Sequence, residues 1–180
     1  MAKEQYKFAD ILQKSSRAGA GYWYGDVWKK VDKCVFCDLN DRYIIKKLGG
    51  IILTTNIYPY TNGHLLIIPK RHITHVKQLS KSEWENVRIL LYISKKLLRE
   101  VLGIKDVWVI YREGRLGPSS EKTVEHLHIH VIPYTKGLVQ WNYQSINHGP
   151  FEVANSFKKA DDFMNSLIKR FKINYSKKND

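Results

Sequence analysis

The sequence predicts an α+β fold: an antiparallel sheet with one main helix inserted between its strands and a further helix near the C-terminus. Three observations support this: several β-rich runs bounded by turn residues, one long stretch with helical spacing of apolar residues, and a strand-like alternation around residue 130. The 180 residues, 43% of them hydrophobic, suit one domain with its own core.

The first strands are expected in the N-terminal half. Residues 43–48 and 51–55 are β-rich and flank Gly49-Gly50, a pair typical of hairpin turns. A third β-rich run, residues 64–69, follows Pro59 and Asn62-Gly63. The sequence therefore predicts three strands before the long helix.

The main helix is expected over residues 82–101, where apolar residues recur at helical spacing. Ser82 is its predicted N-cap, and Gly103 lies just past its end. Two more strands are predicted at residues 106–112 and 125–133, and a closing helix at residues 155–171. The helix thus falls between strands three and four.

We divide the chain into three parts of one domain. Residues 1–33 are predicted to form a short helix and an aromatic arm, residues 34–140 the catalytic domain, and residues 141–180 a helical segment and tail of that same domain.

The composition narrows the classes of partner and location. Thirty basic and 17 acidic residues give a net charge of +13, which attracts anionic partners such as nucleotides or nucleic acid. There is no apolar run long enough for a membrane span and no signal peptide, so we expect a cytoplasmic protein without a membrane partner. The two cysteines, Cys34 and Cys37, are too few for a disulfide scaffold.

The segment from Glu125 to Pro133 alternates polar and apolar residues strictly. On a strand, His126, His128 and His130 would share one face, and the apolar residues between them would face the core. Three histidines in register fit two kinds of chemistry: they could ligate a metal, or one imidazole could attack an electrophile while its neighbours assist. Their spacing leaves both open.

The surrounding motifs are more specific. Asn-Ile-Tyr-Pro-Tyr-Thr-Asn-Gly-His (56–64) and the His-Leu-His-Ile-His-Val-Ile run (126–132) resemble the histidine-triad (HIT) family, nearest its diadenosine polyphosphate hydrolase and phosphorylase branch. The resemblance covers roughly residues 34–134. It implies a nucleotide hydrolase or transferase that cleaves a nucleoside phosphate–X bond, works without an organic cofactor and forms a homodimer.

The resemblance also implies roles for individual residues. His128 would attack the α-phosphorus and form a nucleotidyl-histidine, supported by His130, with His126 orienting the strand and His64 near the phosphate. The implied substrate-binding residues are Asn56 at the ribose, Thr123 at the phosphate, and Lys122 and Arg115 beside it. Glu121 departs from the family pattern, because a carboxylate there would bring negative charge close to the phosphate.

Cys34 and Cys37 form a C-x-x-C with the spacing of zinc ligands. In zinc-containing relatives, two histidines complete such a site. By that resemblance His72 and His126 would join the cysteines around a structural Zn²⁺, with His75 as the competing ligand.

Two other functions remain as alternatives. The triad could hold the metal of a metal-dependent hydrolase, or the chain could be a non-catalytic module that binds nucleic acid through its lysines. The complete triad favours the enzyme over the nucleic-acid partner.

Overall fold

The computed structural model describes residues 34–57, 59–113, 124–134 and 148–176. Contacts divide the chain into two compact units, residues 1–134 and 135–180, which are described separately. The predicted N-terminal helix and aromatic arm lie outside the described residues.

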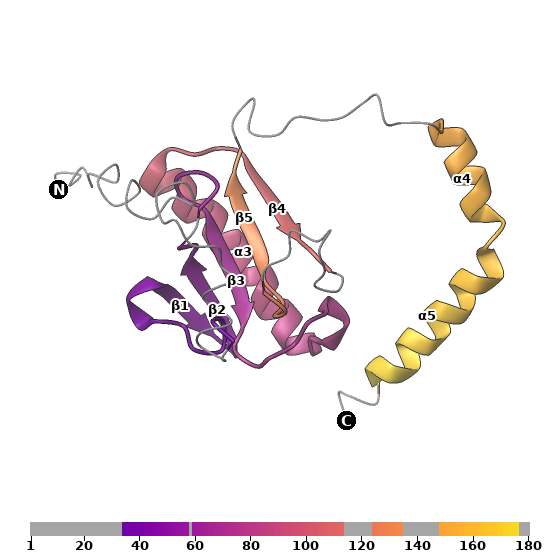
Figure 1. Cartoon of the computed structure of the whole chain (residues 1–180), viewed down its shortest axis with the longest axis horizontal. Coiled ribbons are helices and arrows are strands. Elements are labelled where there is room, and N and C mark those ends of the chain that lie inside the picture. Colours follow the sequence, from indigo (N-terminus) through magenta and orange to yellow (C-terminus); the bar gives the residue numbers. More distant parts are fainter. Residues whose placement is uncertain (1–33, 58, 114–123, 135–147, 177–180) are drawn as a thin grey trace. The chain divides into compact units, whose positions relative to one another are not determined.

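The first unit is built on a five-stranded sheet (Figure 1). The strands are β1 (Ile44–Leu48), β2 (Ile51–Thr55), β3 (Leu65–Pro69), β4 (Val107–Tyr111) and β5 (Ile129–Pro133). Their order across the sheet is β1-β2-β3-β5-β4, and every neighbouring pair is antiparallel. The last strand in sequence therefore occupies an inner position.

Helix α3 (Lys81–Leu102) connects β3 to β4, which confirms the predicted fold class and the place of the main helix. It ends at Gly103, whose φ of 69° is left-handed and readily adopted by glycine. The N-cap is Ser80, not the predicted Ser82: the Ser80 hydroxyl accepts from the Glu83 amide, while the Glu83 carboxylate accepts from the Ser80 amide. This capping box places the helix start two residues earlier.

The inner strands β2, β3 and β5 are buried on both faces of the sheet. On one face, the apolar residues of the histidine segment (Leu127, Ile129 and Val131) belong to a core with α3 residues such as Leu90. On the other face, Leu66 and Ile68 of β3 form a smaller core with Phe36 and Val124. The predicted inward orientation of the apolar alternation is therefore observed.

The β1–β2 hairpin turns at Gly49-Gly50, whose φ angles of 51° and 82° explain the two glycines. Two short 3₁₀ turns flank the sheet, η1 (Asp41–Tyr43) before β1 and η2 (Val76–Gln78) before α3. Tyr43, predicted to begin the first strand, thus belongs to η1.

The histidine strand is shorter than predicted, because β5 begins at Ile129 and not at Glu125. The preceding residues bond to the end of β3 and to the chain after it: the Leu127 amide donates to the Ile73 carbonyl at 2.5 Å, and the His126 ring donates from Nε2 to the carbonyl of Pro69, the last residue of β3. Strand pairing is thus absent where the Leu127 amide bonds to the chain after β3.

The described part of the second unit, residues 148–176, contains two helices, α4 (Pro150–Lys158) and α5 (Asp161–Ser176). The prediction of one closing helix over residues 155–171 was wrong. Pro150 sits at the first position of α4, and the amide of Ala160 donates to the Phe157 carbonyl where α4 ends. Asp161 then lies in the first turn of α5, where the helix dipole favours a carboxylate.

Among the described residues, no helix combines the length and apolar character that a membrane crossing needs.

Candidate active site and metal-ligating cluster

The three histidines of the triad are buried on the sheet face that does not carry α3. His128 and His130 lie with their ring centroids 4.8 Å apart. His64, just before β3, joins them, with its ring centroid 5.1 Å from that of His130. The fold thus gathers four imidazoles from two regions of the sequence.

The tautomer of His128 is determined by the backbone. Its Nδ1 lies 2.7 Å from the carbonyl oxygen of His126, and a carbonyl can only accept a hydrogen bond. Nδ1 of neutral His128 therefore carries the proton, and the lone pair is on Nε2. That is the state required of an imidazole nucleophile.

A second chain of hydrogen bonds sets the tautomers of His64 and His130. The Tyr60 amide donates to His64 Nδ1 at 3.2 Å, and Asn56 Nδ2 lies 3.1 Å from the same nitrogen. His64 therefore has its proton on Nε2, which lies 2.9 Å from His130 Nδ1 and donates to it. His130 in turn carries its proton on Nε2 and can donate it to an anion.

Two aromatic residues beside the histidines had no role in our prediction. The Tyr60 ring stacks on His130, with centroids 5.9 Å apart and an interplanar angle of 16°, and its hydroxyl accepts from Arg112. The Phe36 ring lies 5.0 Å from that of His128. Tyr60 stood inside the quoted motif, and Phe36 lies between the two cysteines, so proximity to those motifs was the available signal.

Four residues with metal-ligating side chains converge next to His128. They are Cys34, Cys37, His72 and His126, whose ligand atoms all lie within 4.8 Å of one another. The shortest separations are 3.3 Å from Cys34 Sγ to His126 Nδ1 and 3.3 Å from Cys37 Sγ to His72 Nδ1. One of the four residues, His126, also belongs to the triad. Among the described residues, this cluster could hold a metal ion.

The donor set fits zinc. Tetrahedral Zn²⁺ with ordinary bond lengths places S and N ligands about 3.5 Å apart. His126 Nε2 lies 2.8 Å from the Pro69 carbonyl and therefore carries the proton, which leaves the Nδ1 lone pair toward the sulfurs. Burial lowers the pKa of His126 to about 4, so its imidazole is neutral at pH 7.

The pKa of the Cys37 thiol is shifted in the opposite direction, upward. Although the residue is exposed, partial desolvation and the adjacent Cys34 raise its pKa to about 11. Two thiols side by side resist ionisation unless a cation compensates the charge, so metal binding at this cluster would release protons.

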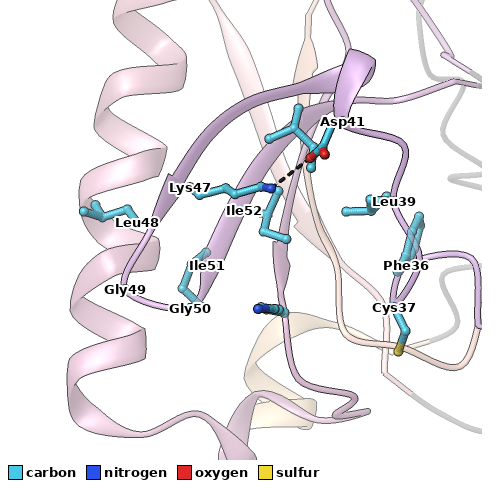
Figure 2. A pocket seen from close by; sticks show the side chains of 12 residues that line it. Phe36, Cys37, Leu39, Asp41, Lys47, Leu48, Gly49, Gly50, Ile51 and Ile52 are labelled. Carbon is cyan, nitrogen blue, oxygen red and sulfur yellow. Dashed lines mark hydrogen bonds and ion pairs between the residues drawn. The ribbon is translucent and has the colours of Figure 1, made fainter.

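A pocket of about 370 Å³ opens on the same side of the sheet, between the 34–41 segment and the β1–β2 hairpin (Figure 2). Phe36 and Leu39 line one side and the hairpin lines the other. Asp41 and Lys47, joined by a 2.8 Å ion pair, also line it. Phe36 lines this pocket and its ring also contacts the rings of the histidines, so the pocket and the histidines are neighbours.

Five other residues considered in the sequence analysis are not part of the described site. Thr123, Lys122, Arg115 and Glu121 fall outside the described residues, so their roles stay predictions. His75, the competing metal ligand, lies 3.7 Å from a Glu113 carboxylate oxygen and is not part of the cluster.

The chain is similar to known proteins in sequence and in fold. Residues 33–140 match the sequence model of a family described as "Scavenger mRNA decapping enzyme C-term binding". The bis(5'-adenosyl)-triphosphatase of Dictyostelium discoideum is 30% identical over 92 residues, which are 51% of this chain and 60% of that protein. An adenosine 5'-monophosphoramidase of Schizosaccharomyces pombe is 31% identical over 104 residues, 56% of this chain and 73% of that protein.

The chain belongs to the histidine-triad (HIT) family. A HIT family protein from Bacillus subtilis has the same fold, with a TM-score of 0.58 and 19% identity over 72% of this chain and 96% of its own. A Zn-bound histidine triad family protein from Mycobacterium smegmatis aligns with a TM-score of 0.50 and 23% identity, over 66% of this chain and 84% of its own. The match to the Dictyostelium HIT relative spans less than two thirds of that relative's length.

Proposed function

We propose that this HIT protein is a nucleotide hydrolase or transferase that cleaves the bond between a nucleoside α-phosphate and a group X through a nucleotidyl-histidine on His128. X is a polyphosphate-linked nucleoside or an amine. The two relatives named for a triphosphatase and a phosphoramidase activity support this class of substrate. The proposal depends above all on the hydrogen bond from His128 Nδ1 to the His126 carbonyl.

That bond supports His128 as the nucleophile for two reasons. It keeps the lone pair on Nε2, and the carbonyl dipole stabilises the positive charge that develops on the ring as Nε2 bonds to phosphorus. A serine or a water molecule bound there would need a separate base to remove its proton, whereas His128 needs none.

The reaction has two steps. Nε2 of His128 attacks the α-phosphorus, the P–X bond breaks, and X leaves with the electron pair and takes up a proton. Water or another acceptor then attacks the phosphorus and releases its proton to the solvent, the P–N bond breaks, and the electron pair returns to Nε2. His130, whose Nε2–H is fixed by the donation from His64, would hydrogen-bond a phosphoryl oxygen in both steps.

We propose further that Cys34, Cys37, His72 and His126 hold a structural Zn²⁺. Such an ion would hold the His126 ring in place, and the His126 carbonyl is the group that orients His128. In this arrangement the metal has a structural role, and the three triad histidines do not together form its ligands. The cluster thereby favours the nucleophile hypothesis over a metal-dependent hydrolase that uses all three histidines.

The nucleoside would occupy the pocket of Figure 2, on the side of the histidines where Phe36 bridges the two. Asn56 lies between His64 and the end of β2, where it can reach a ribose hydroxyl. Because His64 Nδ1 acts as an acceptor, Asn56 Nδ2, 3.1 Å away, donates to it, and this bond holds the Asn56 side chain in a defined orientation.

The test compares His128→Ala with the unaltered protein on diadenosine tri- and tetraphosphate and on adenosine 5'-phosphoramidate, with products separated by chromatography. We expect His128→Ala to lose roughly 1,000-fold or more in kcat, as when a nucleophile is removed. His148→Ala is the matched control, since that histidine is exposed and lies in the other unit.

A second measurement addresses the intermediate. Mass spectrometry of protein quenched in alkali during turnover should find one nucleoside monophosphate on the peptide that contains His128. Undiminished hydrolysis by His128→Ala would contradict the proposed mechanism.

A further inference from the structure

The pocket of Figure 2 has an apolar interior and a charged rim. Phe36, Leu39, Ile44 and Ile52 provide the apolar surface, on which a flat ring can pack. The rim is made by the Asp41 carboxylate and the Lys47 ammonium, which are 83% and 62% exposed and therefore accessible to a ligand. The carboxylate pKa is lowered by the hydrogen bond from Lys47 and by its positive charge, so Asp41 is ionised.

The sheet register relates this pocket to the reacting histidines. His130 is paired with Leu66, Leu66 with Thr54, and Thr54 with Ile44, so these four residues form one row across the sheet. Three strand spacings correspond to roughly 14 Å. That length is comparable with the phosphate, ribose and purine of a nucleotide, which places the far edge of the base near η1 and β1.

We propose that Asp41 and Lys47 select guanine as the base of the substrate. The inference rests on the proposed function. The Watson–Crick edge of guanine presents two neighbouring donors, N1–H and N2–H, and one acceptor, O6. The ion pair presents the complement: a carboxylate that accepts both N–H groups, and an ammonium that donates to O6.

Adenine matches the same pair less well. Its N6 amino group can donate to Asp41 and its N1 can accept from Lys47, but it has no second donor for the carboxylate, so it forms two such hydrogen bonds where guanine forms three. The ion pair itself can persist in the guanine complex, because a carboxylate has about four lone-pair sites and an ammonium has three donors. The selection therefore does not require breaking the 2.8 Å contact.

The test measures affinity and turnover on the full chain. Isothermal titration gives the Kd of GMP and of AMP, and kcat/KM is measured for diguanosine and diadenosine tetraphosphate. We expect GMP and the guanine dinucleotide to be favoured roughly tenfold, the lower range for a bidentate contact to a base. Asp41→Asn, which keeps the size and replaces one acceptor by a donor, should reduce that ratio to about one by weakening guanine binding.

Glu85→Gln is the matched control, because Glu85 is also an exposed carboxylate in an ion pair, with Arg88, but lies on α3 on the other side of the sheet. It should leave the guanine preference unchanged. Equal Kd values for GMP and AMP, or a preference that survives Asp41→Asn, would overturn the guanine assignment while turnover still supported the proposed function. A clear GMP preference without any turnover would contradict the proposed function and retain the guanine site.

Discussion

His64 illustrates how one residue can act through another. Its Nδ1 accepts from the Tyr60 amide, its Nε2 donates to His130, and neither bond can form with the other tautomer. The Tyr60 amide thus determines which ring nitrogen of His130 carries the proton. Its effect reaches His130 through the His64 ring.

Replacing His64 by alanine should therefore reduce kcat by roughly a hundredfold, with KM changed less than threefold, since the imidazole positions a donor that acts in the transition state. Steady-state kinetics on a diadenosine polyphosphate measures both. His75→Ala serves as control because His75 faces Glu113 outside the histidine cluster. A rise in KM with kcat intact would assign His64 to ground-state binding instead.

Thr54 gives a stability prediction at the same scale. Its buried hydroxyl donates to the Tyr43 carbonyl at 2.8 Å and so fixes η1 to β2. Thr54→Val removes the donor at nearly constant volume and should lower the free energy of unfolding by about 1 kcal/mol. Urea denaturation compares it with Thr55→Val, the exposed neighbour on the same strand, for which a change within about 0.5 kcal/mol is expected.

At the scale of elements, the start of α3 depends on Glu83. Its carboxylate accepts from the Ser80 amide and forms a bidentate pair with Arg71, with oxygen–nitrogen distances of 2.7 Å. These bonds link the chain after β3 to the helix that follows. The hydrogen bond from Arg71, opposed by burial and aided by Ser80, lowers the pKa of Glu83 below its ordinary 4.5.

The lowered pKa of Glu83 determines how the stability of the protein depends on pH. A carboxylate whose folded-state pKa is depressed stabilises the fold fully above its unfolded pKa, and this stabilisation disappears as the pH falls through the folded value. Glu83→Gln should thus destabilise the protein at pH 7 by about 1 kcal/mol, the size of a lost cap. The difference from wild type should shrink below pH 4.5.

Urea unfolding at pH 7 and at pH 3.5 measures this difference. Glu85→Gln is the control, since its carboxylate pairs with Arg88 on the exposed surface of α3. A Glu83→Gln defect of equal size at both pH values would show that charge is not the cause.

Several elements could be predicted from local sequence because one local cause decides them. Gly103 ends α3, Gly49-Gly50 makes the hairpin turn, and the alternation of the histidine segment separates core from site. Other boundaries depend on partners far along the chain. The start of β5 is such a boundary, because the Leu127 amide bonds to the Ile73 carbonyl instead of to a strand. The N-cap of α3 was a local signal that the prediction missed, since Ser80 and Glu83 are only three residues apart.

The features of the site also fall into those that the sequence could predict and those that it could not. Spacing pointed to the triad and to the C-x-x-C, whereas the resemblance to the HIT family supplied His64, Asn56, His72 and the metal-ligating role of His126; the structure brings these residues to one region. Tautomers could not be predicted, since they depend on which carbonyl or amide each ring meets. The Asp41–Lys47 rim was also missed, because an exposed charged pair has no distinguishing sequence pattern.

At the scale of the molecule, the metal-ligating cluster joins three distant segments: the C-x-x-C, the turn after β3 and the start of the histidine segment. If the cluster holds Zn²⁺ as proposed, removing the ion with a chelator should therefore lower Tm. A loss of about 4 kcal/mol, expected when the metal is at a thousandfold excess over its Kd, corresponds to roughly 8 to 16 °C for a protein of this size.

Calorimetry with and without chelator, combined with elemental analysis, measures this effect. One zinc per chain is expected in the untreated protein and none in a Cys34→Ser/Cys37→Ser variant. Zinc retained by that double variant would place the metal elsewhere and contradict the proposed cluster. The predicted homodimer and the cytoplasmic location stay predictions at this scale.

The inner position of β5 has a consequence for how the protein is made. The strand β5 lies between β3 and β4 but follows both in sequence. In a nascent chain that ends before residue 129, the edges of β3 and β4 that pair with β5 are therefore still unpaired. Such edges are prone to pairing with other chains, so the growing protein is most vulnerable to aggregation just before this strand emerges from the ribosome. The segment that completes the sheet also delivers His128 and His130, so folding and catalytic competence would be reached together.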